Sequence, residues 1–157
     1  MHIATNSEID ISLEVKTAEI AKNFSKILEK GDVLFLHGEV GVGKTTFIRY
    51  LINCLQIKND LNVTEVTSPT FNLVNEYNVG IFIIQHYDLY RIRSSDEIKN
   101  IGLLENQKEI LTLIEWPEKI DNKIDNKIDL MFKYSDDMSK RSLFIKGLSN
   151  KKFNAIK

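Results

Sequence analysis

The segment from Gly38 to Thr45 constrains the fold of this chain more than any other feature. It reads G-E-V-G-V-G-K-T and fills every fixed position of the pattern G-x-x-x-x-G-K-[ST]. Glycines let a loop turn with positive φ and bring its N–H groups close to a phosphate. An apolar run at 33–36 precedes the loop, and apolar residues at helical spacing follow it. This order of strand, loop and helix predicts a P-loop.

The residue types of the loop predict a site for ATP and Mg²⁺. Backbone N–H groups would surround the phosphates, and the dipole of the following helix would add positive potential at the same place. The Lys44 ammonium would reach the β- and γ-phosphates, and the Thr45 hydroxyl would bind Mg²⁺. The candidate nucleotide-binding residues of this segment are Glu39, Val40, Gly41, Val42, Gly43, Lys44, Thr45 and Thr46.

Two acids are candidates for completing the Mg²⁺ site. Glu115 directly follows the apolar run 111–114, and Asp88 comes slightly beyond the apolar run 81–84. Both would project at the carboxyl edge of a parallel sheet, where ligands bind in open α/β folds. A solvated strand end explains either acid taken alone, so the pattern by itself leaves the choice between them open.

Three further features are weaker signals. Ser68 and Thr70 flank Pro69 in a region that often senses the γ-phosphate in P-loop hydrolases, although Ser-Pro alone is typical of a turn. His86, taken alone, is typical of a structural histidine. The nearby arginines at 91 and 93 are candidates for stabilising a transferring phosphate, but exposed arginines are usually only solvated.

The pattern of elements predicts one α/β domain over residues 1–157, with a core at about 9–147. Apolar strands alternate with helical segments, and few helices are visible, which favours a three-layer P-loop NTPase domain with a small mixed β-sheet. We expect strands at 9–15, 33–36, 63–66, 71–77, 81–84, 111–114, 128–134 and 142–146, and helices at 17–28, 46–55 and from Ser94. We expect residues 148–157 to form a frayed basic tail.

Composition excludes several classes of protein. The formal net charge of −1 gives no global attraction to DNA, RNA or membranes. One cysteine, Cys54, excludes an internal disulfide and a cysteine-based metal cluster. No signal peptide or membrane-spanning apolar run is visible, so the cytoplasm is the expected location.

The sequence also contains two matches to N-K-x-D, the tetrapeptide that reads guanine in GTPases. They occupy 122–125 and 126–129, within a near-duplicated stretch. The guanine-reading loop normally follows an apolar strand directly, whereas these copies follow a polar segment. The D-x-x-G signature is absent, since Leu89-Tyr90-Arg91 follows Asp88. We therefore expect ATP to be preferred over GTP.

Four segments together resemble the TsaE (YjeE) family of bacterial ATPases in tRNA threonylcarbamoyladenosine biosynthesis. They are the P-loop with Thr46-Phe47, then S-P-T at 68–70, H-Y-D-L-Y-R at 86–91, and I-E-W-P-E at 114–118. The resemblance covers about residues 10–146. It implies slow ATP hydrolysis and assembly with the TsaB and TsaD proteins, through which tRNA is modified at adenosine 37.

The resemblance also implies roles for individual residues. Thr45 and Glu115 would bind Mg²⁺, and Asp88 would act near the γ-phosphate as a base or water-orienting group, with Lys44 as the second catalytic residue. Trp116 would flank the site. Ser68 and Thr70 would belong to a mobile switch segment, while Glu14 and Arg141 would lie beside the nucleotide. Val42 replaces the usual alanine of the family, and Lys140 replaces a usual glycine.

Three other functions remain open from the residues. A small-molecule kinase would need an acceptor pocket and an arginine-rich lid, but the chain shows only Arg91 and Arg93 together and is short for such a lid. A GTP-dependent switch would rest on the N-K-x-D matches. A nucleotide-gated adaptor would use binding to order the segment 67–70, with hydrolysis incidental.

Overall fold

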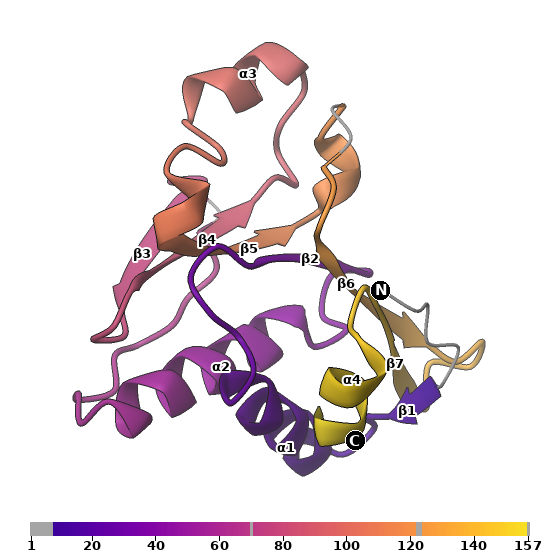
Figure 1. The fold of residues 1–157 in the computed structure, drawn as a ribbon. Coiled ribbons are helices and arrows are strands. Elements are labelled where there is room, and N and C mark those ends of the chain that lie inside the picture. Colours follow the sequence, from indigo (N-terminus) through magenta and orange to yellow (C-terminus); the bar gives the residue numbers. More distant parts are fainter. Residues whose placement is uncertain (1–7, 70, 122–123, 157) are drawn as a thin grey trace.

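The computed structural model describes residues 8–69, 71–121 and 124–156, which form a seven-stranded mixed sheet with helices on its faces (Figure 1). The strand order is β1-β7-β6-β2-β5-β4-β3. The strands are β1 Glu8–Asp10, β2 Val33–His37, β3 Val74–Asn78, β4 Ile83–Asp88, β5 Ile110–Glu115, β6 Ile128–Tyr134 and β7 Arg141–Lys146. The helices are α1 Glu14–Ser25, α2 Lys44–Lys58, α3 Ser95–Asn100 and α4 Asn150–Ile156, with short 3₁₀ turns at Gln107–Glu109 and Pro117–Lys119.

The four central strands run parallel. The strand β2 pairs in parallel with β5 and β6, and β4 pairs in parallel with β5. The outer strands β7, β1 and β3 are antiparallel to their neighbours. The carboxyl ends of β6, β2, β5 and β4 therefore meet at one edge, where the loops after the strands can form a binding site.

Helices cover both faces of the sheet, so the expected mixed α/β class is confirmed. Figure 1 shows α1, α2 and α4 on one face and α3 on the other. Successive residues of β2 point to opposite faces: Leu34 and Leu36 join the larger core under α1 and α2, whereas Val33 and Phe35 join a smaller core on the α3 side. All four side chains are buried because both faces are covered.

Aromatic packing links the P-loop helix to its neighbours. Phe47 of α2 lies edge-on to Phe24 of α1, with ring centroids 5.5 Å apart, and 6.1 Å from Phe132 of β6. All three side chains are buried. Edge-to-face contacts of this kind add to the free energy gained from burial. They fix the start of α2 against the sheet, and this start carries the P-loop.

Several expected boundaries are wrong. The expected strand at 9–15 ends at Asp10, and α1 begins at Glu14, so Thr17 lies buried within the helix instead of capping it. The alternating pattern misleads here because the apolar residues at 13 and 15 are exposed. The segment 63–66 forms no strand. The remaining expected strands are present, with shifted ends at β3 and β4.

The expected frayed tail is also wrong. Residues Asn150–Ile156 form α4, and Phe153 and Ile156 are buried in the main core. The helix contacts α1 beside the C-terminus (Figure 1). The two apolar residues lie three positions apart on one helical face, which is the spacing of an amphipathic helix. In the part of the chain that the structure describes, no helix is both long and apolar enough to cross a membrane.

Candidate nucleotide and metal site

The P-loop connects β2 to α2 and depends on glycine at its first position. Gly38 has φ +141°, and a Cβ atom there would lie 2.7 Å from the backbone oxygen of Phe132. No side chain fits at that distance, so glycine is required for the loop to pass over β6. Gly43 adopts φ +118° directly before α2 and begins the helix without a side-chain cap. The N–H groups at the start of this helix remain available to an anion.

Lys44 is the first residue of α2 and is almost fully buried, with 4% of its surface exposed. Its ammonium donates a hydrogen bond to the Gly38 backbone oxygen and lies 4.1 Å from the ring centroid of Trp116. Burial lowers the pKa of Lys44, although the negative charges of Glu115 and Asp88 oppose this shift. The buried cation has no carboxylate within salt-bridge distance among the described residues.

Thr45 faces Glu115 at the carboxyl end of β5. The Thr45 hydroxyl oxygen lies 3.4 Å from Glu115 Oε1. The other oxygen of this carboxylate, Oε2, lies 2.8 Å from Nε2 of His86 on β4. Glu115 is only 3% exposed, so α2 and β5 together hold a buried carboxylate beside a hydroxyl.

Asp88 ends β4 directly beside Glu115, because the two residues are register partners in the parallel ladder. The Ser68 hydroxyl donates a hydrogen bond of 2.9 Å to Asp88 Oδ2. The Tyr90 backbone N–H donates one of 3.0 Å to Asp88 Oδ1. The segment around Ser68 is thus joined to the strand end that carries this acid.

Trp116 turns the chain away from β5 immediately after Glu115. Its backbone has φ +59°, a left-handed conformation that is uncommon for a residue with a bulky side chain. The Tyr90 ring lies 4.8 Å from the Trp116 ring, centroid to centroid, so Tyr90 packs against the ring that lies over Lys44. Backbone conformations of this kind cluster at ligand sites, where the surrounding structure enforces them.

These side chains line one cleft of about 410 Å³ at the carboxyl edge of the sheet. The sequence-predicted residues that the cleft brings together are Val40, Gly41, Gly43, Lys44, Thr45, Thr46, Ser68, Asp88, Glu115 and Trp116. Tyr90 and Arg91 also line it. Both candidate acids are therefore present, which the sequence pattern left open.

The other candidates lie outside this lining. Val42 is fully buried in the core, so only its backbone can face a ligand, and Glu39 is exposed beside the loop. Arg141 lies near the P-loop, with Nη1 3.8 Å from a Cβ placed on Gly43. It is held there by a bond from Nη2 to the Ser12 backbone oxygen. Thr70 lies outside the described residues.

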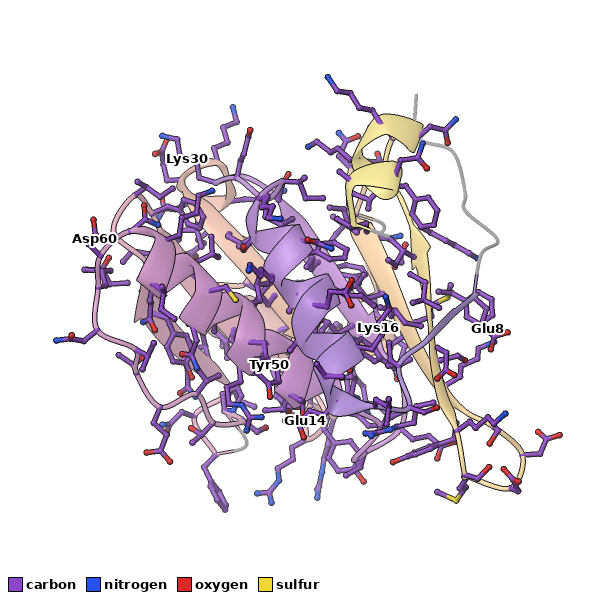
Figure 2. The ribbon with its side chains drawn as sticks, turned by 90° about the horizontal axis from the view of Figure 1, so that it is seen from below. Glu8, Glu14, Lys16, Lys30, Tyr50 and Asp60 are labelled. Atoms are coloured by element: carbon purple, nitrogen blue, oxygen red, sulfur yellow. The ribbon has the colours of Figure 1, made fainter. Side chains whose placement is uncertain are left out.

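Glu14 is engaged elsewhere. It begins α1 and accepts hydrogen bonds of 3.1 Å from Arg49 and 2.7 Å from Tyr50 of α2. Figure 2 shows Glu14 and Tyr50 close together at one end of the α1–α2 pair. Because these bonds join exposed side chains on the helix layer, the structure does not bring Glu14 into the cleft with Lys44.

Sequence reasoning missed three residues that shape the site. The Tyr134 hydroxyl, at the end of β6, donates a 2.7 Å hydrogen bond to the Gly41 backbone oxygen. The Tyr90 ring packs at a tilt against Trp116, and His86, which looked like a structural histidine in the sequence, forms a hydrogen bond with Glu115. A signal existed for His86, because its position two residues before Asp88 on one strand puts both on the same face. Tyr134 comes from a distant strand and gave no local signal.

The second N-K-x-D match lies away from this cleft. Asp129 is the second residue of β6. Its carboxylate lies 2.8 Å from His37 Nε2 and 2.8 Å from Lys127 Nζ. Burial acts to raise the pKa of Asp129, but the hydrogen bonds and the charges of His37 and Lys127 together outweigh it and lower the pKa overall. Lys127 also lies over the Phe35 ring. These contacts explain the tetrapeptide as part of the structure at the start of β6.

The donor set at Thr45 and Glu115 fits a small, hard cation. Mg²⁺ prefers oxygen ligands and is commonly held in proteins by one or two carboxylate or hydroxyl oxygens together with phosphate and water. Here a hydroxyl and a buried carboxylate oxygen lie 3.4 Å apart beside a loop shaped for phosphate. These two residues would hold the ion, and its charge would help to neutralise a bound phosphate.

The chain matches the model of the family "Threonylcarbamoyl adenosine biosynthesis protein TsaE" over residues 11–143. The chain belongs to the TsaE family. A TsaE protein of Rickettsia bellii is 42% identical over 115 residues, covering 73% of this chain and 77% of that protein. One from Aquifex aeolicus is 36% identical over 112 residues, covering 71% and 77%. Both are named tRNA threonylcarbamoyladenosine biosynthesis proteins.

The fold also matches a solved structure. The crystal structure of Bacillus subtilis YdiB superposes with a TM-score of 0.71 over 99% of this chain and 94% of that one, at 24% identity. At this identity the match supports the fold alone. Within the TsaE assignment, the matched range 11–143 contains the P-loop, both acids and Trp116.

Proposed function

We propose that this TsaE-family protein binds ATP with Mg²⁺ and hydrolyses it slowly in support of tRNA threonylcarbamoyladenosine formation. The observation that carries the proposal is the convergence of Lys44, Thr45, Asp88 and Glu115 on one cleft after a P-loop. These residues come from two strand ends and one helix, and they supply the cation, metal ligand and acid that phosphoryl transfer requires. The names of the Rickettsia and Aquifex relatives supply the pathway.

Each group has a role in this proposal. The loop N–H groups and Lys44 would neutralise the phosphates, which requires the ammonium to leave the Gly38 oxygen for the nucleotide. Thr45 and Glu115 would hold Mg²⁺. Asp88 would orient the attacking water or accept its proton, and it is already positioned by the Ser68 hydroxyl. Trp116 would close one side of the site.

The proposal extends to partners and location. We infer that the protein acts in the cytoplasm with TsaB and TsaD, and that it meets tRNA through that complex. The small net charge of −1 agrees with indirect contact, because a protein that binds RNA alone usually presents a basic surface. Through the hydrogen bond between Ser68 and Asp88, hydrolysis of the bound nucleotide would change the position of the segment around Ser68.

A titration with ATP and GTP, with and without purified TsaB–TsaD, tests the proposal. Trp116 is the single tryptophan and lines the cleft, so its fluorescence reports nucleotide binding directly. We expect ATP to bind more tightly than GTP, slow release of phosphate by the protein alone, and faster release with the partners. Tighter binding of GTP, or a hydrolysis rate that ignores the partners, would contradict the proposal.

A further inference from the structure

His86 and Glu115 form a pair inside the protein. His86 is fully buried and Glu115 is 3% exposed, and His86 Nε2 lies 2.8 Å from Glu115 Oε2. The residues stand on the neighbouring parallel strands β4 and β5. Both point to the face covered by α2, as their neighbours Ile84 and Leu113 do in the same core. A buried charged group is costly unless it is hydrogen-bonded, so this bond matters to Glu115.

The pair assigns different partners to the two carboxylate oxygens. Glu115 Oε2 meets His86, while Oε1 faces the Thr45 hydroxyl at 3.4 Å. A carboxylate on a flexible side chain can otherwise rotate about its last bond. The contact with His86 removes this freedom and leaves Oε1 directed towards the P-loop helix. Oε1 of Glu115 is therefore the oxygen that faces the proposed metal site beside Thr45.

The second ring nitrogen of His86, Nδ1, indicates which of the two nitrogens carries the proton. Nδ1 is buried and has no hydrogen-bond partner among the described residues. A proton on Nδ1 would have no acceptor among the described residues, so we expect the ring to carry its proton on Nε2 and donate it to Glu115. Buried polar atoms normally have hydrogen-bond partners, and an unpaired Nδ1 contributes nothing to the packing of the ring. Among the described residues, the hydrogen bond to Glu115 is the one that the His86 ring makes.

We propose that His86 is a positioning residue that fixes the Glu115 carboxylate for metal binding at the cleft. The inference rests on the function proposed above, since it assigns a partner to the same metal site. Residues that hold a metal ligand in place usually raise metal affinity roughly 10- to 100-fold. His86 would therefore control the Mg²⁺ requirement of nucleotide binding without touching nucleotide or metal.

Two substitutions separate this role from packing. In His86→Gln the side-chain amide nitrogen can reach the place of imidazole Nε2 and still donate to Glu115. In His86→Asn the amide reaches only the place of Nδ1, so Glu115 loses its donor. Binding of Mn²⁺ with a non-hydrolysable ATP analogue can be followed by electron paramagnetic resonance. The Mg²⁺ dependence of Trp116 fluorescence gives a second measure.

We expect His86→Asn to weaken metal binding roughly 10- to 100-fold and to leave nucleotide binding in EDTA unchanged. We expect His86→Gln to restore most of the metal affinity. Wild-type metal affinity in His86→Asn, or an equal loss in both variants, would overturn the inference and leave the proposed function standing. Nucleotide affinity that is the same with Mg²⁺ as in EDTA in the wild type would instead reject the proposed metal site, and this inference with it.

A measurement on the unmodified protein covers the case in which the variants do not fold. Nitrogen-15 NMR distinguishes the two ring tautomers of a histidine, and the chain has only three histidines to assign. We expect the His86 ring to carry its proton on Nε2. A ring with its proton on Nδ1 and none on Nε2 would leave Glu115 without a donor and would overturn the inference.

Discussion

Thr45 Oγ1 and Glu115 Oε1 lie 3.4 Å apart, although 70 positions separate the residues in the chain. The contact exists because β2 and β5 are parallel neighbours, so the loop after β2 and the last residue of β5 reach the same edge. Oxygen atoms from two elements that meet in this way form a site where a cation and a phosphate can be bound together.

Replacing Glu115 by alanine should remove this oxygen site. We expect Mg²⁺-dependent ATP turnover to fall about 100-fold or more, because a charged group that stabilises the reacting phosphate is lost. Phosphate release at saturating ATP measures the effect. The control is Glu109→Ala, an exposed acid paired with Lys30. Unchanged turnover in Glu115→Ala would remove this residue from the site.

Asp88 should act on hydrolysis and not on binding. We expect Asp88→Asn to bind ATP with nearly wild-type affinity while hydrolysis falls about 10²- to 10⁴-fold, the usual contribution of a positioned base. Trp116 fluorescence and phosphate release give the two values separately. Asp96→Asn is a matched control at an exposed position of α3. Full hydrolysis in Asp88→Asn would reject a role in activating water.

Tyr134 should stiffen the P-loop. The substitution Tyr134→Phe removes the 2.7 Å bond to the Gly41 backbone oxygen and leaves the ring in place. One such bond contributes about 0.5–1.5 kcal/mol, so we expect nucleotide affinity to fall several-fold. Tyr87→Phe removes a similar bond to Gln85 elsewhere and should leave nucleotide affinity unchanged. Equal affinities in all three proteins would show that the loop does not need Tyr134.

The C-terminal helix should contribute to stability. Phe153 is 5% exposed in the main core, so Phe153→Ala should lower the free energy of unfolding by about 3 kcal/mol or more. Lys151→Ala, on the exposed side of α4, should change it by less than about 0.5 kcal/mol. Urea denaturation measures both. A frayed tail would instead make the two variants equally stable.

The pair between His37 and Asp129 should make stability depend on pH in the acid range. The pKa of Asp129 is lower in the folded protein than its ordinary value of 3.8. Its stabilisation is therefore fully present above about pH 4 and is lost as pH falls through the lower, folded-state pKa. Asp129→Asn should flatten the loss of stability as the pH falls below about 4, measured by urea denaturation. An unchanged profile would contradict the contribution of this carboxylate.

The sequence alone was sufficient to predict a glycine-rich loop between a strand and a helix, and to place the two candidate acids at strand ends. These predictions succeed because they depend on local properties, namely glycine at fixed spacing and apolar runs that end in a polar residue. The same local reasoning failed at the start of α1, where Leu13 and Val15 alternate like a strand but are exposed. It also failed at Phe153, whose partners are distant in the sequence.

Only the tertiary structure decided which residues act together. The strand order placed Asp88 beside Glu115, set His86 against the same carboxylate, and brought Tyr134 to the P-loop. No single segment encodes these contacts, because they depend on how parallel strands are ordered and aligned in the sheet. The chain thus specifies its phosphate loop locally, whereas the geometry of its acids follows from long-range packing.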